Sequence, residues 1–342
     1  MVWWSVAMGL ALAGAPPGAK RSKSPPPAAI DHLALDVWSG SAVDMHGDRL
    51  LVVDAGTYAV LSPVDGLLLG EVHEGPRKDK GPNPHLVEVR GGALTADRAL
   101  LWSMQTAYAA DGADGHAVLR AVATSNVRLR TAAMAPDGER FAVAWDNALA
   151  LYERDGSVWW RQHEVTDTGP VRGVAHTGDR VITSSGNGLQ VRARSDDWSV
   201  EGEVRIEEGH LIAFAADPHR IAALVADTGW WRVEVFDADA GWARSAVLEL
   251  EEPDLTSTGA AKVDVQGDRI LVGLPGVGRE CGRAWLFEKE RRRWRYRRVD
   301  DPGGCEVVLF GSAVALGEDT LAVGAAGFQQ TPRLYLFASA PR

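Results

Sequence analysis

The sequence predicts an all-β protein, a single seven-bladed β-propeller of four-stranded antiparallel blades. A tight turn rich in Asp, Glu or Gly leads into a short apolar strand seven times, and the copies are spaced 40 to 51 residues apart. This spacing is the length of one propeller blade. Apolar residues are also spread evenly along the chain instead of being pooled in one segment. The residues that follow the turns are Arg49, Arg98, Arg140, Arg180, Arg220, Arg269 and Thr320.

Turn chemistry divides each repeat into strands. In the third repeat, the inner strand ends at Pro136-Asp137-Gly138, and the second and third strands run from there to Arg154-Asp155-Gly156. Asp and Gly suit such turns because they tolerate turn dihedrals. The inner strands are rich in Ala, Gly and Val, as expected where blades crowd around a narrow axis. The predicted blades are 41–72, 85–122, 130–164, 171–205, 210–250, 260–299 and 310–337.

The last repeat lacks a fourth strand, because the chain ends soon after RLYLF. The segment HLALDVW, from His32 to Trp38, is strand-like and belongs to no repeat of its own. Pairing it with RLYLF would close the ring and cover two exposed strand edges. We therefore expect an N-terminal strand to complete the seventh blade.

The first thirty residues are predicted to lie outside the propeller. Residues 1–15 are predicted to be a signal peptide, because the apolar run Val2 to Gly14 is followed by small residues. The run is too short to span a bilayer, so no transmembrane segment is expected after cleavage. Residues 16–30 read as a Pro-rich basic linker, and 31–342 as the propeller, which we expect to be a monomer. The protein is thus expected to be secreted or periplasmic, or cytoplasmic if the apolar run is not a signal.

The two cysteines fall in the sixth repeat and the connection after it. Cys281 lies between its second and third strands, and Cys305 lies between repeats six and seven. Both kinds of loop emerge on the same face of a four-stranded meander, so the thiols can meet. In an exported protein they are expected to form a disulfide. Two unpaired thiols in a cytosolic protein is the alternative.

The last two repeats resemble the FG-GAP repeat of integrin α-chain propellers and their bacterial relatives. The resemblance rests on FGSAVALGEDTLAVGAAG with RLYLF, and on KVDVQGDRILVGLPG with GRAWLFEK. Repeats one to five are more loosely similar to WD-repeat or quinoprotein-like propellers. FG-GAP repeats often carry a calcium loop of alternating carboxylates. The matching segments LPGVGRECGR and AAGFQQTPR have no such series, so neither a metal nor a cofactor is predicted.

Charge and aromatic residues give weaker indications. The net charge of −10 argues against nucleic-acid binding and favours cationic partners. The Arg-rich segment 291–298 is interpreted as the protected edge strand of blade six, with an anionic surface as the alternative. Asp111, Asp114 and the segment 237–241 are interpreted as outer hairpin turns. Trp159-Trp160 and Trp230-Trp231 are adjacent pairs, so only one member of each pair can face a given side of its strand. The other member could be exposed, and the stacking of a sugar ring on an exposed tryptophan is a minor alternative.

The loops between blades carry the candidate functional residues, since propeller sites usually lie on that face. The catalytic candidates are His85, His163 and His210, and the binding candidates are His73, Asp167, Glu207, Glu208, Asp254, Asp300 and Asp301. Imidazoles and carboxylates around one axis could bind a metal or act as acid and base. Their spacing matches no catalytic motif, so solvated loop residues are the simpler interpretation.

Two functions follow from these observations. The first is an exported, non-enzymatic propeller scaffold that binds a protein or glycan partner through its loop face, because rigid sheets with variable loops suit recognition. The alternative is a propeller enzyme, either a hydrolase or lyase, or a quinoprotein-like oxidoreductase, that uses the histidine loops. A fold alone does not decide between them.

Overall fold

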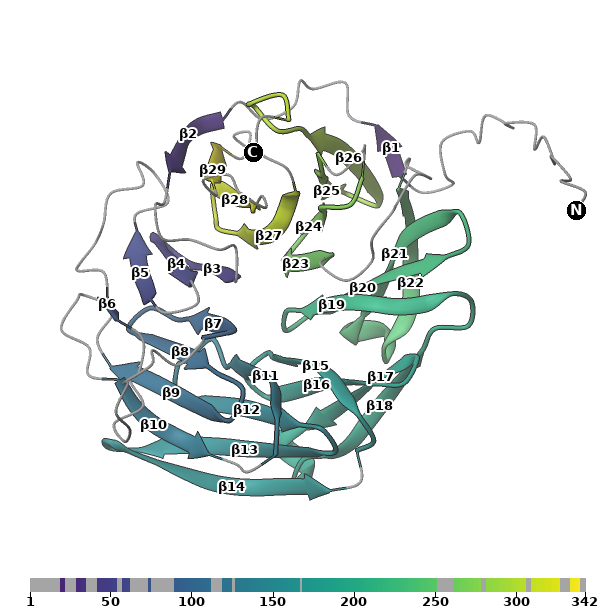
Figure 1. Ribbon diagram of the computed structural model, residues 1–342. Coiled ribbons are helices and arrows are strands. Elements are labelled where there is room, and N and C mark those ends of the chain that lie inside the picture. The colour runs from purple at the N-terminus through teal and green to yellow at the C-terminus, as the bar shows by residue number, and fades with distance from the viewer. Residues whose placement is uncertain are drawn as a thin grey trace, which may run out of the picture.

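The computed structural model describes most of the propeller and two short N-terminal segments. The described residues are 19–21, 29–34, 42–53, 57–61, 73–74, 89–111, 119–124, 127–166, 168–250, 261–277, 281–305, 309–326 and 333–338. Seven antiparallel blades stand around one axis, which is the predicted architecture (Figure 1). In blades one to five the strands follow one another outward in chain order, and in blades six and seven an N-terminal strand is added on the outside.

The strand limits agree closely with the predicted blades. Blades one to three consist of β3 (Ala42–His46), β4 (Arg49–Val53), β5 (Thr57–Leu61) and β6 (His73–Glu74); β7 (Gly91–Leu94), β8 (Arg98–Trp102), β9 (Thr106–Asp111) and β10 (Leu119–Thr124); and β11 (Leu129–Met134), β12 (Arg140–Trp145), β13 (Ala148–Asp155) and β14 (Val158–Thr166). Blades four and five consist of β15 (Val171–His176), β16 (Arg180–Ser185), β17 (Gly188–Ala193) and β18 (Ser199–Arg205); and β19 (His210–Ala216), β20 (Arg220–Asp227), β21 (Trp230–Asp237) and β22 (Ala243–Leu250). Blades six and seven consist of β23 (Lys262–Gln266), β24 (Arg269–Leu274), β25 (Arg283–Glu290) and β26 (Arg293–Val299); and β27 (Phe310–Leu316), β28 (Thr320–Ala325) and β29 (Arg333–Ala338).

An N-terminal strand closes the ring, as predicted. The strand β2 (Ala29–Ala34) pairs antiparallel with β29 and supplies the fourth strand of blade seven. It begins three residues before the predicted segment, and residues 35–38 lie outside the described residues. The first and last parts of the chain therefore share one sheet, which hides the free edge of β29.

A second N-terminal strand covers the outer strand of blade six. The strand β1 (Ala19–Arg21) pairs parallel with β26, opposite Trp294–Tyr296, and makes this blade a five-stranded sheet. The Arg-rich strand β26 was expected to be an edge protected by charge. At these three residues it is instead paired on both sides, so the edge of this sheet is β1.

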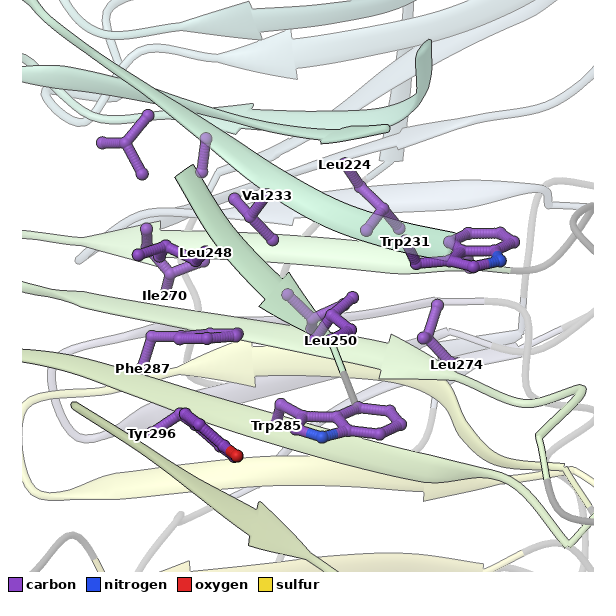
Figure 2. Packing of buried hydrophobic residues seen from close by; sticks show 14 of the residues in the cluster. Leu224, Trp231, Val233, Leu248, Leu250, Ile270, Leu274, Trp285, Phe287 and Tyr296 are labelled. Atoms are coloured by element: carbon purple, nitrogen blue, oxygen red, sulfur yellow. The ribbon is translucent and has the colours of Figure 1, made fainter. Parts of the chain in front are cut away.

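The core lies between blades, because each sheet buries both faces against its neighbours. Between blades five and six, Leu224, Trp231 and Val233 of one blade pack against Trp285 and Phe287 of the next (Figure 2). Residues two apart along a strand face the same side, so alternate apolar residues fill successive interfaces. This packing explains why the repeats show short runs of branched and aromatic residues.

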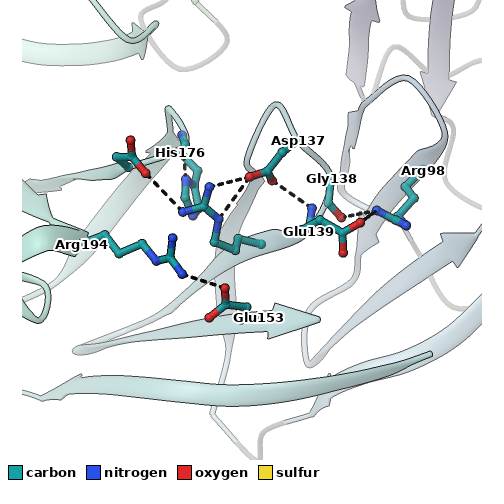
Figure 3. A network of polar contacts seen from close by, with 10 residues as sticks. Arg98, Asp137, Gly138, Glu139, Glu153, His176 and Arg194 are labelled. Atoms are coloured by element: carbon teal, nitrogen blue, oxygen red, sulfur yellow. Dashed lines mark hydrogen bonds and ion pairs between the residues drawn. The ribbon is translucent and has the colours of Figure 1, made fainter. Parts of the chain in front are cut away.

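In four blades the arginine that follows the inner turn contacts the inner turn of the next blade. Arg140 Nη1 in blade three lies 3.4 Å from Asp179 Oδ1 in the inner turn of blade four. Arg220 donates to the carbonyl oxygen of Gly267 in the turn of blade six, and Arg269 donates to that of Gly317 in the turn of blade seven. Figure 3 shows the corresponding contacts around blade three. The arginine that marks the repeat in the sequence therefore makes contacts between blades in the structure.

The predicted disulfide joins Cys281 and Cys305, whose Cα atoms lie 5.1 Å apart. Beside it, the backbone N–H of Phe310 donates to the carbonyl oxygen of Cys281 at 2.9 Å. Gly311 has a φ of 92°, and a Cβ there would lie 2.6 Å from the carbonyl oxygen of Arg283. The start of blade seven thus approaches blade six too closely for a larger residue.

Candidate functional site

Three of the loop-face candidates lie together between blades four and five. Glu207 and Glu208 occupy the connection from β18 to β19, and His210 begins β19. All three side chains are exposed. The carbonyl oxygen of Glu208 accepts a hydrogen bond from Arg232 at 3.0 Å, and its carboxylate lies 3.9 Å from the same guanidinium. Glu208 therefore helps to fix this connection to blade five.

His163 does not lie in a loop, which corrects the predicted end of blade three. The outer strand β14 continues to Thr166, and His163 pairs with Leu151 inside it. Because Leu151 packs against blade four, His163 faces the same neighbour, and its Nδ1 lies 3.9 Å from Asp197 Oδ1. His163 is thus separated from the loop face and from His210.

Asp300 and Asp301 hold the connection from blade six to blade seven. Asp300 pairs with Arg298, with 2.8 Å between Oδ1 and Nε. Asp301 accepts hydrogen bonds from the backbone N–H groups of Gly303 and Cys305, each at 2.9 Å. Its carboxylate fixes the turn that presents Cys305 to Cys281, which is a structural role.

The other candidates cannot be placed at a site. His85, Asp167 and Asp254 lie outside the described residues, as does the predicted signal peptide 1–15. His73 lies in the outer strand β6 of blade one rather than in a loop. Within the described part of the chain, no three His, Cys, Asp or Glu side chains gather where they could hold a metal ion. The segment 237–241 is an outer turn with a short 3-10 helix, η2 (Ala238–Ala240), as interpreted from the sequence.

Two aspartates near the ring axis were not singled out from the sequence. Asp44 Oδ1 and Oδ2 accept hydrogen bonds from the backbone N–H groups of Met45 and Leu94, and Asp264 binds those of Val265 and Leu316 in the same way. Each carboxylate thus links its inner strand to that of the next blade. Burial raises the pKa of Asp44 to about 7 and that of Asp264 to about 6, and the Asp264 charge raises the pKa of Asp44 further.

The sequence distinguishes these two aspartates from the residues at the same position in the other blades. Asp44 and Asp264 pair with the residue two places after the repeat-marking arginine. The other five blades have Ala at this register position. These residues are Ala93, Ala133, Ala175, Ala215 and Ala315. An Asp at a position where the other five blades have Ala indicates that the inner strand makes additional hydrogen bonds there.

A polar network between blades three and four includes a buried histidine. His176 lies in this network (Figure 3), where its Nδ1 accepts a hydrogen bond from the backbone N–H of Gly178 at 3.2 Å. Its ring packs edge-on against Trp198. Burial lowers the pKa of His176 to about 3, and the nearby Arg140 charge lowers it further. His176 is therefore neutral at physiological pH and fixes a turn.

Exposed apolar side chains lie on the outer strands of blades three and four, on the sides that face each other. Val158, Trp160 and Val200 are 47%, 57% and 41% exposed, and they are three of the five large hydrophobic residues that the described part exposes. Val158 and Trp160 pair with Asp155 and Glu153, on the side of β14 that faces blade four. Val200 pairs with Arg192, on the side of β18 that faces blade three. We call Val158, Trp160 and Val200 the rim patch.

The tryptophan pairs divide between the two faces of their strands, as predicted. Trp159 packs edge-on against Phe141, with 4.8 Å between ring centroids, whereas Trp160 is exposed. Trp231 and Trp230 likewise face opposite neighbours of blade five. Trp160 is thus the aromatic surface of the rim patch.

An open groove of about 500 Å³ lies between blades four and five, on the other side of β18 from Val200. One wall is formed by Glu203, Val204 and Arg205 of β18 with Glu207. The opposite wall is formed by Phe236, Trp242 and Arg244. Gly202 permits this wall to approach, because a Cβ there would lie 2.9 Å from Trp242 Cδ1.

The arginines of β26 are largely engaged within their own blade. Arg297 is buried and pairs with Glu288 at 3.2 Å, while Arg295 pairs with Glu290 at 3.0 Å. Trp294 and Tyr296 between them are buried in the core. These pairings reduce the positive surface that the sequence suggested for an anionic polymer.

The fold and surface define a seven-bladed β-propeller with WD40-like structural neighbours. A chain of the mitotic checkpoint complex has a similar structure, with 12% identity, a TM-score of 0.65, and coverage of 98% of this chain and 100% of that one. The WD40 domain of Pan2 from Neurospora crassa is also similar, with 9% identity, a TM-score of 0.65, and coverage of 94% and 98%. These identities show the fold alone. No protein-family model and no curated protein matches the sequence, and no described helix is long and apolar enough to cross a membrane.

Proposed function

We propose that this chain is an exported, protein-binding β-propeller whose partner docks on the rim patch. The observation that carries the proposal is the exposure of Val158, Trp160 and Val200 on neighbouring outer strands. Apolar side chains clustered on a surface and rimmed by polar ones are typical of protein interfaces, and exposed tryptophan is a frequent anchor. This surface, on the side of blades three and four, replaces the loop face that the sequence suggested as the binding surface.

Polar groups around the rim patch favour a protein partner. Arg194 of blade four pairs with Glu153 of blade three at 2.9 Å, next to Trp160. Such a polar border around an apolar centre matches the anatomy of protein interfaces. Export is supported by the Cys281–Cys305 disulfide, since disulfides persist in oxidising compartments. The resemblance of blades six and seven to FG-GAP repeats remains a prediction from the sequence.

A crosslinking experiment tests the rim patch. A photoreactive phenylalanine analogue is placed at Trp160, and in a control protein at Met104, which is 41% exposed on blade two. We expect a discrete protein adduct at position 160 in extracts of the producing cells and none at 104. Replacing Val158 and Val200 by Ser should abolish the adduct without lowering the melting temperature. Equal adducts at both positions, or none at either, would refute a protein-docking role for this patch.

A glycan partner is the second candidate, because the exposed ring of Trp160 could stack on a sugar. Oligosaccharides that quench the fluorescence of wild-type protein but not of Trp160→Leu would favour it. The enzyme alternative depends on His85, His163 and His210. Its test is the loss of a discovered hydrolase, lyase or oxidoreductase activity when all three are replaced together.

A further inference from the structure

Blades five and six share a register that makes their outer strands comparable residue by residue. Phe236 pairs with Arg244 in blade five, and Phe287 pairs with Tyr296 in blade six. Ala243 and Arg244 therefore correspond to Arg295 and Tyr296. Trp242 takes the place of Trp294, but it lies just before β22 and has a φ of 66°. Each of the two corresponding tryptophans also lies under an arginine of the preceding blade. Arg180 lies 5.7 Å from the Trp242 ring, and Arg220 lies 5.3 Å from the Trp294 ring.

In blade six this position holds an added strand. Ala19, Lys20 and Arg21 of β1 pair parallel with residues 294–296, and β1 also contacts β22 of the preceding blade. The added strand therefore sits between the outer strands of blades five and six (Figure 1). The chain itself shows that a blade edge of this kind accepts an extended basic segment.

In blade five the corresponding position is the groove. Trp242 and Arg244 line it, and its other wall comes from β18 of the preceding blade. Within the described residues β22 is the last strand of its sheet, and Ala243, Arg244 and Ser245 are exposed. An edge strand presents unpaired backbone groups, so it can receive a further strand.

The charges of the groove favour a basic segment. Arg244 Nη1 lies 3.3 Å from Oε2 of Glu234, which is fully buried, and Arg205 lies 3.5 Å from Glu203. Both arginines thus already have a carboxylate. Glu207 is exposed at the groove, and no ion pair joins it to another described residue. A lysine or arginine of an incoming segment would meet this carboxylate, in a chain whose net charge is −10.

We propose that the groove between blades four and five binds an extended basic segment of a partner protein, which adds to the start of β22, at residues 243–245, as a parallel strand. The segment takes the place that β1 takes on blade six. This proposal rests on the proposed function, because it gives the protein partner a second point of attachment in addition to the rim patch.

A labelled peptide tests the proposal on the full chain. The probe has the sequence of residues 17–24, PGAKRSKS, and the control peptide has Glu in place of its three basic residues. We expect fluorescence anisotropy to show binding of the probe alone. Glu207→Arg should weaken this binding ~10-fold, whereas Glu318→Arg, an equal charge change at an exposed turn of blade seven, should leave it unchanged.

Hydrogen exchange identifies the strand addition. We expect the probe to slow exchange at residues 243–245, and probe methylated on its backbone nitrogens to have no such effect. No binding at millimolar probe, equal binding by the Glu207→Arg and Glu318→Arg proteins, or unchanged exchange at β22 would each overturn the proposal. If the probe slows hydrogen exchange only at residues 294–296, it has displaced β1 from β26, and this result would also overturn the proposal.

Two further outcomes separate this proposal from its alternatives. A concentration-dependent dimer that is lost when residues 1–24 are deleted would assign the groove to a second copy of this chain. A failed peptide experiment with intact crosslinking at Trp160 would overturn the groove proposal alone. Failure of the crosslinking experiment would count against the protein-binding function itself.

Discussion

The guanidinium of Arg98 in blade two lies 2.7 Å from the carboxylate of Glu139 in the inner turn of blade three. It also donates to the carbonyl oxygen of Gly138 in the same turn at 3.0 Å. Arg140 and Arg220 reach the turns of the following blades in the same manner. We call Arg98, Arg140, Arg220 and Arg269 the arginine column, because each joins its blade to the inner turn of the next one. Blade seven has Thr320 at this position, and its sheet is completed by β2.

Replacing Arg98 by Ala should lower the free energy of unfolding by about 2–3 kcal/mol, because the buried stem and two hydrogen bonds are lost. Urea unfolding followed by circular dichroism measures this change. Arg161→Ala is the control, since Arg161 is exposed and, within the described part of the chain, forms an ion pair with Glu164 of its own strand. It should change stability by less than about 0.5 kcal/mol. Equal effects of the two substitutions would contradict a role of the arginine column in joining blades.

The contribution of Asp44 to the free energy of unfolding should decrease as the pH rises. Its pKa is raised from 3.8 to about 7 in the folded protein, so the folded state holds the proton more tightly than the unfolded state. The resulting stabilisation is complete below about pH 4 and is lost as the pH rises towards 7. Between pH 5 and 8, the stability of wild type relative to Asp44→Asn should fall by roughly 2 kcal/mol.

The comparison with Asp44→Asn is necessary because His176 acts in the opposite direction. The pKa of His176 is lowered from 6.5 to about 3 in the folded protein. As the pH falls below 6.5, His176 therefore becomes protonated in the unfolded state but not in the folded state, which destabilises the folded protein. Urea unfolding of both proteins at several pH values removes this shared contribution. A constant difference between the two proteins from pH 5 to 8 would contradict the raised pKa of Asp44.

Reducing the disulfide should destabilise the junction of blades six and seven. Cys281 and Cys305 are separated by 24 residues, and closing a loop of this length is worth roughly 3–4 kcal/mol on the chain-entropy model. The double change Cys281→Ser and Cys305→Ser should therefore lower the melting temperature, and reductant should then have no further effect. Reductant that leaves the wild-type melt unchanged, with both thiols shown to be reduced by mass, would contradict this contribution.

The repeat and its closure could be predicted because they depend on local chemistry. The Asp and Gly turns, the arginine column and the leftover strand segment are visible in the sequence, and so is the position of both cysteines on one face. The pairing of Ala19–Arg21 with β26 could not be predicted, since three residues in a Pro-rich basic segment carry no alternating pattern. His163 was misplaced because the outer hairpin of blade three is longer than in the other blades, and strand ends are set by pairing. The rim patch could be predicted only in part, because the exposure of Trp160 and Val200 depends on how blades three and four face each other.

The two N-terminal strands should contribute unequally to stability. Deleting residues 29–34 removes β2 and leaves blade seven with three strands and an open edge on β29. Deleting residues 19–21 removes β1 from a blade that is already complete. We expect the first deletion to lower the melting temperature by roughly 10 °C and the second by only a few degrees, since each kcal/mol corresponds to about 2–4 °C in large domains. Thermal melts under oxidising conditions measure both changes. Similar melts for the two deletions would mean that β2 does not close the ring, and that the blades hold together through the arginine column and interblade core alone.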